Sequence, residues 1–449
     1  MLTINTDTIL AQIQAALEKN DVNSALKVLE DLRTPDQAEV FYELEDDEKI
    51  ALLPHLDPSV SADILEELED EEVAELVSQL DSDSAVRILD EMDPDEAADF
   101  LGDVSREQAE NYLAQMENPQ EVRPLMIHAD DSAGGLMTSE FIALRTRMRA
   151  GDAINVLRTY KPDSEEIYYL FVVDSEDVLS GVIGLRDLII SDPDVILGEI
   201  MDPQVVSVNA GTDQEECARI IAKYDLLALP VVDSSRRLIG VITVDDVIDV
   251  LEEETTEDFQ RLGGAEPLDQ SYLNTGTWMI AKKRIGWLLL LFLTGSLTGT
   301  VMRMFEAELA AVVALAYFIP LLIGTGGNAG SQTTSTIIRA LAVGDMDVSD
   351  GLVSLWHELR VGLILGLGMS GFAFIRAITW GTTPQLAFAV AFSIIAIVIW
   401  ANASGAVLPL LAARLKIDPT VVSGPVMSTL VDATGLFIYF TIAKSVIGV

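Results

Sequence analysis

The pattern of apolar and polar residues divides the chain near residue 270. The last 179 residues contain long apolar runs with few charges, whereas the first 270 alternate short apolar groups with acidic residues. Long apolar runs are typical of helices that cross a lipid bilayer. The pattern therefore predicts a soluble half made of several small elements, followed by a helical membrane half.

Five runs in the second half are long and apolar enough to predict membrane helices, which need about 20 mostly apolar residues. They cover Ile285–Met302, Leu309–Ile338, Val361–Ile375, Leu386–Ala413 and Thr420–Ala443. The second and fourth are long enough to tilt or break. The third is rich in glycine, which favours close helix packing.

Basic residues at the ends of these runs predict the orientation of the helices. With the soluble half in the cytoplasm, seven Lys or Arg side chains flank the helices on the inside and three on the outside, as the positive-inside rule requires. The N-terminus lacks the apolar core of a signal peptide. We therefore expect a cytoplasmic N-terminus and an external C-terminus. The inside residues are Lys282, Lys283, Arg284, Arg339, Arg360, Arg414 and Lys416.

A 12-residue period marks the soluble half between residues 44 and 105. An apolar residue followed by an acid or a serine recurs at Leu44-Glu45, Leu56-Asp57, Leu68-Glu69, Leu80-Asp81, Met92-Asp93 and Val104-Ser105. Asp and Ser cap helix N-termini, and Pro is favoured in the first turn. The period predicts short helices of about two turns that stack into an all-α superhelical domain.

A second repeat follows at an offset of 59 residues, where "FVVDSEDVLSGVIGLRDLI" matches "PVVDSSRRLIGVITVDDVI". Each copy predicts strand, turn, strand and helix, preceded by another helix. The duplicate resembles a tandem pair of CBS domains, an α/β fold. In that family the cleft often binds adenine nucleotides, which implies Tyr169, Arg186 and Asp187, or Asp246, as candidates for an ATP site. The alternative is a pair that serves only as a dimerisation platform.

Charge is placed very unevenly along the chain. Residues 1–270 hold 64 of the 72 Asp and Glu and 18 of the 28 Lys and Arg, a net charge of −46, whereas the remainder carries +2. Nucleic acid is not expected as a partner, because phosphates need cationic residues. The acidity favours cations as ligands. A solvated surface adapted to salt is the alternative for most of these carboxylates.

The most acidic stretch, "DDVIDVLEEETTEDFQ", leads from the second repeat toward the membrane half. Its acids Asp246, Asp249, Glu253 and Glu257 follow helical spacing and share one face, where like charges repel. Mg²⁺ and Ca²⁺ are hard cations that bind such oxygens. The stretch therefore predicts a connecting helix that responds to cations. A solvated linker is the alternative.

Two predicted membrane segments contain polar groups that lipid does not accommodate. "IPLLIGTGGNAGSQTTSTIIRAL" combines glycines with amides and hydroxyls, and "DPTVVSGPVMSTLVDATGL" contains Asp432. Such a segment must pack on protein or line water. A carboxylate at mid-membrane costs roughly 2.5–3.5 kcal/mol, so it marks an ion path by default. An acid that only hydrogen-bonds between helices is the alternative.

These pieces, together with "DDSAGGLMT" at residues 130–138, resemble the MgtE family of magnesium channels over nearly the whole chain. The resemblance implies a homodimer in the inner membrane, with a pore for Mg²⁺ that cytosolic Mg²⁺ closes. It implies Asp432 as the pore acid, Asp418 as the acid at the cytoplasmic mouth and Gly326, Gly327 and Asn328 as pore lining. The regulatory Mg²⁺ ligands that it implies are Asp95, Asp99, Glu215, Asp225, Asp246, Asp249, Glu254, Glu257 and Asp258.

The chain departs from this family pattern at two positions. Gly424, before Pro425, stands where some members have Asn, and Ser331 replaces an amide. Both changes remove an amide side chain near the implied pore. The hydration of the pore or its ion selectivity is therefore expected to differ from that of those relatives.

The expected organisation has five parts in chain order. Residues 1–128 form the acidic helical-repeat domain, 129–196 and 197–250 the two CBS domains, 246–270 the connecting helix and linker, and 271–449 the membrane domain with five helices. Together they predict a multi-domain protein with an all-α part, an α/β part and an α-helical membrane part.

Of three other functions, a coupled carrier remains open, whereas a sensor without transport and an enzyme are disfavoured. A carrier driven by protons or another ion would use Asp432 as a relay. A sensor without transport would not need the polar second segment. An enzyme is not expected, because an intramembrane aspartyl protease needs a second membrane Asp and the three His residues are scattered along the chain.

Overall fold

The computed structural model describes residues 6–68, 70–161, 167, 169–268, 272–273 and 275–448. It divides into two compact units, Met1–Leu251 and Glu252–Val449. Of the predicted repeat positions, Glu69 lies outside the described residues.

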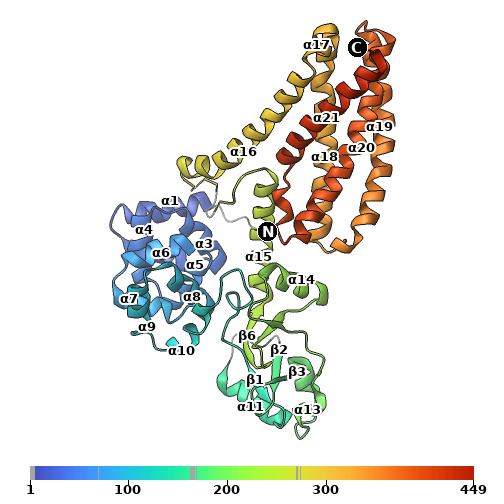
Figure 1. Cartoon of the computed structure of the whole chain (residues 1–449). Coiled ribbons are helices and arrows are strands. Elements are labelled where there is room, and N and C mark those ends of the chain that lie inside the picture. Colours follow the sequence, from blue (N-terminus) through green and yellow to red (C-terminus); the bar gives the residue numbers. More distant parts are fainter. Residues whose placement is uncertain are drawn as a thin grey trace. The chain divides into compact units, whose positions relative to one another are not determined.

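The first unit begins with a stack of short helices (Figure 1). The 12-residue period is confirmed, because α5, α7 and α8 each begin one residue after a repeat Asp, and the Asp57 and Asp81 carboxylates accept backbone N–H groups of their helices. The apolar member of each pair faces inward, with Leu44, Leu56 and Met92 all buried. The helices are α1 (Thr6–Leu17), α2 (Val22–Glu30), α3 (Thr34–Tyr42), α4 (Asp46–Leu52), η1 (Leu53–His55), α5 (Pro58–Glu66), α6 (Asp70–Gln79), α7 (Ser82–Leu89), α8 (Pro94–Asp103), α9 (Arg106–Leu113), α10 (Pro119–Val122) and η2 (Leu125–Ile127).

The duplicated motif forms two three-stranded sheets with the same order, β1-β2-β3 and β4-β5-β6. In each sheet the first pair is parallel and the second antiparallel, and Val172 faces Gly181 as Val231 faces Gly240. The tandem CBS prediction is confirmed at this level. The elements are β1 (Ala143–Arg145), α11 (Ala150–Tyr160), β2 (Tyr169–Val173), β3 (Leu179–Gly184), α12 (Leu185–Ile190), α13 (Leu197–Ile200), β4 (Val208–Asn209), α14 (Gln214–Tyr224), β5 (Ala228–Val232), β6 (Leu238–Thr243) and α15 (Val244–Leu262).

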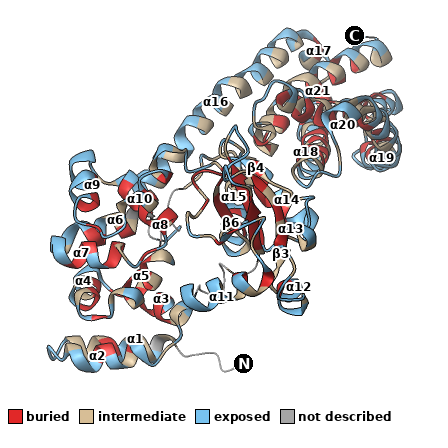
Figure 2. Cartoon of the chain, turned by 90° about the horizontal axis from the view of Figure 1, so that it is seen from below, coloured by how far each residue is buried: buried red, intermediate tan, exposed pale blue. Residues whose placement is uncertain are grey.

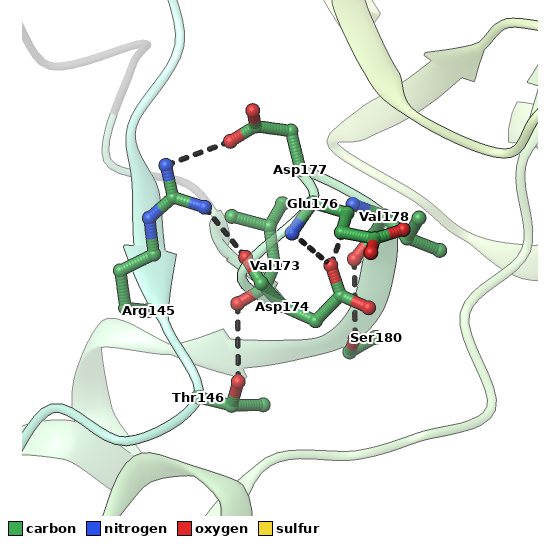
Figure 3. A network of polar contacts seen from close by, with 8 residues as sticks. All are labelled: Arg145, Thr146, Val173, Asp174, Glu176, Asp177, Val178 and Ser180. Carbon is green, nitrogen blue, oxygen red and sulfur yellow. Dashed lines mark hydrogen bonds and ion pairs between the residues drawn. The ribbon is translucent and has the colours of Figure 1, made fainter.

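The repeated Asp after each Val-Val pair builds the turn that follows it. Asp174 Oδ1 accepts the N–H groups of Glu176 and Val178 at 2.7 and 3.1 Å, and Arg145 binds the turn from β1 (Figure 3). Asp233 repeats this pattern in the second copy. These two acids are therefore satisfied by the backbone and belong to the fold.

The two copies exchange their leading segments. Thr138, upstream of the first sheet, pairs with Val241 of the second, and Asp202 pairs with Val182 of the first. A Cβ on Gly240 would stand 2.5 Å from Met137 Sδ, and one on Gly181 2.5 Å from Met201 Sδ. The repeated glycine is therefore required for this crossing.

The second unit contains the five helices long and apolar enough to cross a membrane, which confirms the predicted number for the described residues. α18, α20 and α21 form its core, α19 packs on α20, and α16 contributes no buried residue (Figure 2). The elements are α16 (Thr277–Met304), α17 (Glu306–Ala311), η3 (Val313–Phe318), α18 (Ile319–Ala342), η4 (Val348–Asp350), α19 (Gly351–Thr379), α20 (Pro384–Arg414), η5 (Pro419–Val421) and α21 (Gly424–Ile447).

The structure differs from the sequence prediction most clearly in the first three membrane segments. α16 begins at Thr277 rather than at the predicted Ile285. The second segment breaks at Val312, before the glycine-rich stretch, and that stretch is continuous helix in α18. The third helix begins at Gly351 rather than near Val361. The prediction was too short because polar residues in the first turns of the helix interrupt the apolar run. Glu358 therefore lies within this longer membrane helix.

Candidate cation sites

Asp432 lies in the middle of α21 and is half-buried. Its carboxylate makes no hydrogen bond or ion pair with any residue that the structure describes. Ser428, one helical turn earlier, packs against Gly327 of α18, where a Cβ would stand 3.2 Å from Ser428 Oγ. The acid therefore lies next to the α18–α21 crossing without a partner among the described residues of its chain.

The glycine-rich stretch of α18 serves mainly to bring helices together. A Cβ on Gly326 would stand 2.5 Å from Ile397 and 2.7 Å from Val431, so only glycine fits between α20 and α21. Gly326 and Gly327 are buried, whereas Asn328 is exposed. Within one chain, only Asn328 of the three implied pore residues presents a side chain to the outside of the bundle.

The two departures from the family pattern contact each other. Ser331 Oγ donates to the Gly424 carbonyl at 3.1 Å and lies 3.3 Å from Ser428 Oγ. A Cβ on Gly424 would stand 3.6 Å from Ser331 Oγ, which is ordinary contact. The Ser331 hydroxyl therefore hydrogen-bonds to the backbone at the start of α21.

Glu358 is a second acid among the membrane helices, and the sequence analysis missed it. Its Oε2 accepts hydrogen bonds from Thr333 Oγ1 at 3.1 Å and from Asn402 Nδ2 at 3.0 Å. These donors come from α18 and α20, so the carboxylate links three helices. The signal that could have found it is its place four residues before Gly362, just outside a membrane segment that the sequence predicted too short. Unlike Asp432, it already has protein partners.

A cavity of about 130 Å³ in the first unit gathers five carboxylates. Asp95 of α8 is 8% exposed, and its Oδ1 has no hydrogen-bond partner among the described atoms. Asp246 opens α15 and accepts hydrogen bonds from the backbone and hydroxyl of Thr243. The other acids that line the cavity are Asp93, Glu140 and Asp245, none of which the sequence analysis had selected as a ligand.

Electrostatics in this cavity disfavours the ionised carboxylates. Burial, followed by the charges of Asp246, Glu96 and Asp93, raises the pKa of Asp95 well above its usual range. Burial and the charges of Asp245 and Asp93 raise the pKa of Asp246 to about 6, although Thr243 opposes the shift. An oxygen-only site with an unpartnered buried carboxylate fits a hard cation such as Mg²⁺. The volume also leaves room for water on the ion.

Stability without Mg²⁺ should depend on pH through Asp246. A carboxyl whose pKa is near 6 in the folded chain and 3.8 otherwise favours folding when protonated. The melting temperature of the full chain in detergent with a chelator should therefore rise by roughly 5 °C as pH falls from 7 toward 5. Thermal melting measures it, and Asp246→Asn should flatten the curve. A melting temperature that falls over this window would contradict the charge repulsion.

A second acidic group lies at the far end of α15, within the second unit. Arg261 Nη2 contacts Glu257 Oε2 at 2.7 Å and its Nη1 contacts Asp418 Oδ2 at 2.9 Å. Asp418 also accepts the Thr420 N–H at 2.8 Å. Burial, with the charges of Asp418 and Glu254, raises the pKa of Asp258. The implied mouth and helix acids are thus brought together, around an arginine that the sequence analysis did not select.

The remaining implied ligands are dispersed within the single chain. Glu215 lies in the first turn of α14 and Asp225 caps its other end, about 15 Å away along the helix. Asp99 is half-buried one turn beyond Asp95, and Asp249 is exposed one turn beyond Asp246. In the described part of the chain, no three Asp, Glu, His or Cys residues are arranged so that they could hold a metal ion together.

The implied nucleotide residues lie at the first CBS sheet. Arg186 and Asp187 are exposed at the start of α12, with Nη1 and Oδ1 3.7 Å apart. Tyr169 pairs with Gly184, where a Cβ would stand 3.7 Å from Asp187 Oδ2. Tyr169 also lines the acidic cavity. The three residues are therefore neighbours, at an open surface.

Family profiles match most of the chain. One described as "Divalent cation transporter" matches residues 319–442, and one described as "MgtE intracellular N domain" matches residues 32–128. A CBS-domain profile matches residues 133–193 and 197–253. The order of these profiles follows the order of the elements described above.

Curated relatives and solved structures agree with these profiles. The chain is 47% identical over 324 residues to the magnesium transporter MgtE of Thermus thermophilus, covering 72% of each chain, and 36% identical over 325 residues to that of Enterococcus faecalis. It resembles the crystal structure of the cytosolic domain of the Mg²⁺ channel MgtE in complex with ATP, with a TM-score of 0.51 and 39% identity over 54% of this chain and 99% of that one. A crystal structure of the soluble part of a magnesium transporter matches 56% of this chain and 99% of its own, with a TM-score of 0.50 and 32% identity.

Proposed function

The chain belongs to the MgtE family of magnesium transporters, and we propose that it conducts Mg²⁺ across a membrane through a pore that Mg²⁺ itself closes. It is a multi-pass membrane protein with five apolar helices. The basic flanks support a cytoplasmic soluble half. No enzymatic step is part of this proposal.

The observation that carries the transport proposal is the unpartnered carboxylate of Asp432 in α21. In a two-fold dimer each chain would supply one such acid. Two carboxylates can hold a hydrated Mg²⁺ without removing its water, which this ion releases reluctantly. A pore site of this kind must bind well enough to admit the ion and weakly enough to release it.

Closure is proposed to use the acidic cavity of the first unit and the acidic group around Arg261 in the second unit. Without Mg²⁺ the carboxylates around Asp95 and Asp246 repel, which favours separation of the elements that bear them. Mg²⁺ would bridge them and favour the docked arrangement, because a ligand shifts an equilibrium by its differential affinity. The cluster at Glu257 and Asp418 would respond in the same way.

The test is Mg²⁺ current in patches or liposomes that hold the purified chain, with Mg²⁺ on the side of the soluble half stepped from micromolar to about ten millimolar. Current at low Mg²⁺ that disappears at high Mg²⁺ is the expected result. Mg²⁺ flux that requires a proton gradient, without current of its own, would move the protein to the coupled carriers. Absence of both would overturn transport.

ATP is proposed as a ligand of the CBS pair. The supporting observations are the adjacent Tyr169, Arg186 and Asp187 and the likeness to an MgtE cytosolic domain solved with ATP. An aromatic ring can stack on adenine, and a carboxylate can accept hydrogen bonds from the hydroxyl groups of ribose. The acidity of the surrounding surface makes Mg²⁺-bound ATP the expected form.

Arg261 is expected to stabilise the contact between the end of α15 and Asp418. Arg261→Gln would leave Glu257 and Asp418 as facing acids, so more Mg²⁺ would be needed to dock the end of α15. Because each carboxylate is about one-third exposed, we expect a rise of about two- to fivefold in the Mg²⁺ concentration that half-closes the pore. Current against Mg²⁺ concentration measures it. A fall would instead mean that Arg261 occupies the place of the ion.

A further inference from the structure

A cavity of about 410 Å³ lies where the end of α15 and the chain after it meet the first turns of α16. Two hydrogen bonds join residues that line it. The Leu268 N–H donates to Gln260 Oε1 at 2.8 Å, and the Glu266 N–H donates to the Lys283 carbonyl at 3.1 Å. Gly264 has a φ of 74°, a left-handed conformation that suits glycine, and turns the chain back. The walls therefore belong to the connecting helix and to the first membrane helix.

The cationic side of this cavity comes from α16. Lys283 and Arg284 line it, Lys282 precedes them, and Glu266 is the one acid among the described lining residues. These basic residues fall in the first two to three turns of a span that begins at Thr277. In the proposed orientation, that position is the level of lipid headgroups on the cytoplasmic side.

The apolar side comes from both walls. Phe259 is 72% exposed and Leu288 57% exposed, and both line the cavity together with Leu268. Trp278, 83% exposed at the start of α16, is a residue type that favours the membrane interface. A ligand that satisfies this lining needs an anionic group and an apolar body. Inorganic phosphate has only the first.

We propose that this cavity binds an anionic phospholipid, with the phosphate at Lys283 and Arg284 and the apolar part toward Leu288. Basic pockets beside membrane helices on the cytoplasmic side are suited to such headgroups. An occupied cavity would join the end of α15 to α16 through the lipid. This binding does not depend on the proposed transport, since it concerns only the described lining and the membrane.

Lipid retention tests the proposal. The purified full chain would be loaded with phosphatidylglycerol or phosphatidylcholine, and bound lipid would be counted by native mass spectrometry. The test variant is Lys282→Gln, Lys283→Gln, Arg284→Gln, and its control of equal charge and membrane side is Arg360→Gln, Arg414→Gln, Lys416→Gln. We expect phosphatidylglycerol binding to fall about tenfold or more in the test variant alone. Ala265→Trp, which fills the cavity without changing charge, should lower binding as well.

Several outcomes would overturn the proposal. Equal loss in both charge variants would mean a diffuse electrostatic effect of the membrane surface. Equal retention of phosphatidylcholine and phosphatidylglycerol would remove the role of Lys283 and Arg284. Displacement of the lipid by millimolar inorganic phosphate would assign the site to a free anion. Unchanged binding in Ala265→Trp, with that variant folded, would place the lipid outside the cavity.

Discussion

Asp432→Asn should abolish Mg²⁺ flux, with a loss on the order of 100-fold or more in liposomes that hold the purified chain. Its carboxylate has no partner in the described part of its own chain, so its charge is available to an ion. The substitution keeps size and helix but removes one negative charge per chain from a low-dielectric site, where charge–charge energies are several times those in water. A Mg²⁺-sensitive dye inside the liposomes measures the flux.

Glu358→Gln is the matched control, because it also neutralises one acid among the membrane helices. Gln can still accept the hydrogen bonds of Thr333 and Asn402, so the link between α18, α19 and α20 should persist. We expect flux within about threefold of the parent chain, since each such hydrogen bond contributes only about 1 kcal/mol. Loss of flux in Glu358→Gln with flux retained in Asp432→Asn would assign the ion path to the other acid.

Local rules were enough to predict most of the fold. The 12-residue period predicted helices capped by Asp57 and Asp81 because capping depends on residues adjacent in sequence. The duplicated Val-Val-Asp turns predicted the strand pairs β2–β3 and β5–β6 for the same reason, whereas the short parallel strands β1 and β4 were not predicted. Five apolar runs predicted five membrane helices. Each of these features repeats or extends over many residues, so single irregularities did not hide it.

The errors in the membrane half arose where tertiary contacts override hydropathy. Polar residues at the start of α19 shortened the predicted span, although Glu358 is satisfied by donors from two other helices. The glycine-rich segment of α18 was expected to pack on protein or to line water, and Gly326 packs against Ile397 and Val431, two neighbours that the sequence could not identify. A sequence shows that a residue is small or charged, but not which neighbouring side chain packs against it or hydrogen-bonds to it.

The acidic sites show the same division. The sequence selected Asp246 from the spacing of the acidic stretch but Asp95 only through the family resemblance, and nothing local pairs two residues that 151 positions separate. The fold brings both to one cavity and adds Asp93, Glu140 and Asp245. In the sequence these three acids cannot be distinguished from ordinary surface acids. Arg261 was missed because its partner Asp418 lies 157 positions away.

The pair Asp95→Asn, Asp246→Asn should leave the pore open at Mg²⁺ concentrations that close the parent chain. Mg²⁺ loses two of its acidic ligands in the cavity, so its binding favours the docked arrangement less than in the parent chain. We expect the half-closing Mg²⁺ concentration to rise at least tenfold, since each acid is held beside other negative charges. Adding Glu257→Gln, in the second acidic group, should extend the loss of closure. Current against cytoplasmic Mg²⁺ measures both.

Asp249→Asn is the control for this pair, because it removes an exposed acid one turn beyond Asp246 on the same helix. It should shift closure less than the pair does if the cavity, rather than the general charge of α15, binds the ion. Misfolding is separated from lost regulation by the melting temperature without Mg²⁺. Relief of repulsion should raise it in the double variant, whereas a damaged fold would lower it. A pore that closes normally in this stabilised variant would show that Mg²⁺ acts elsewhere, and the cluster around Arg261 would be the next candidate.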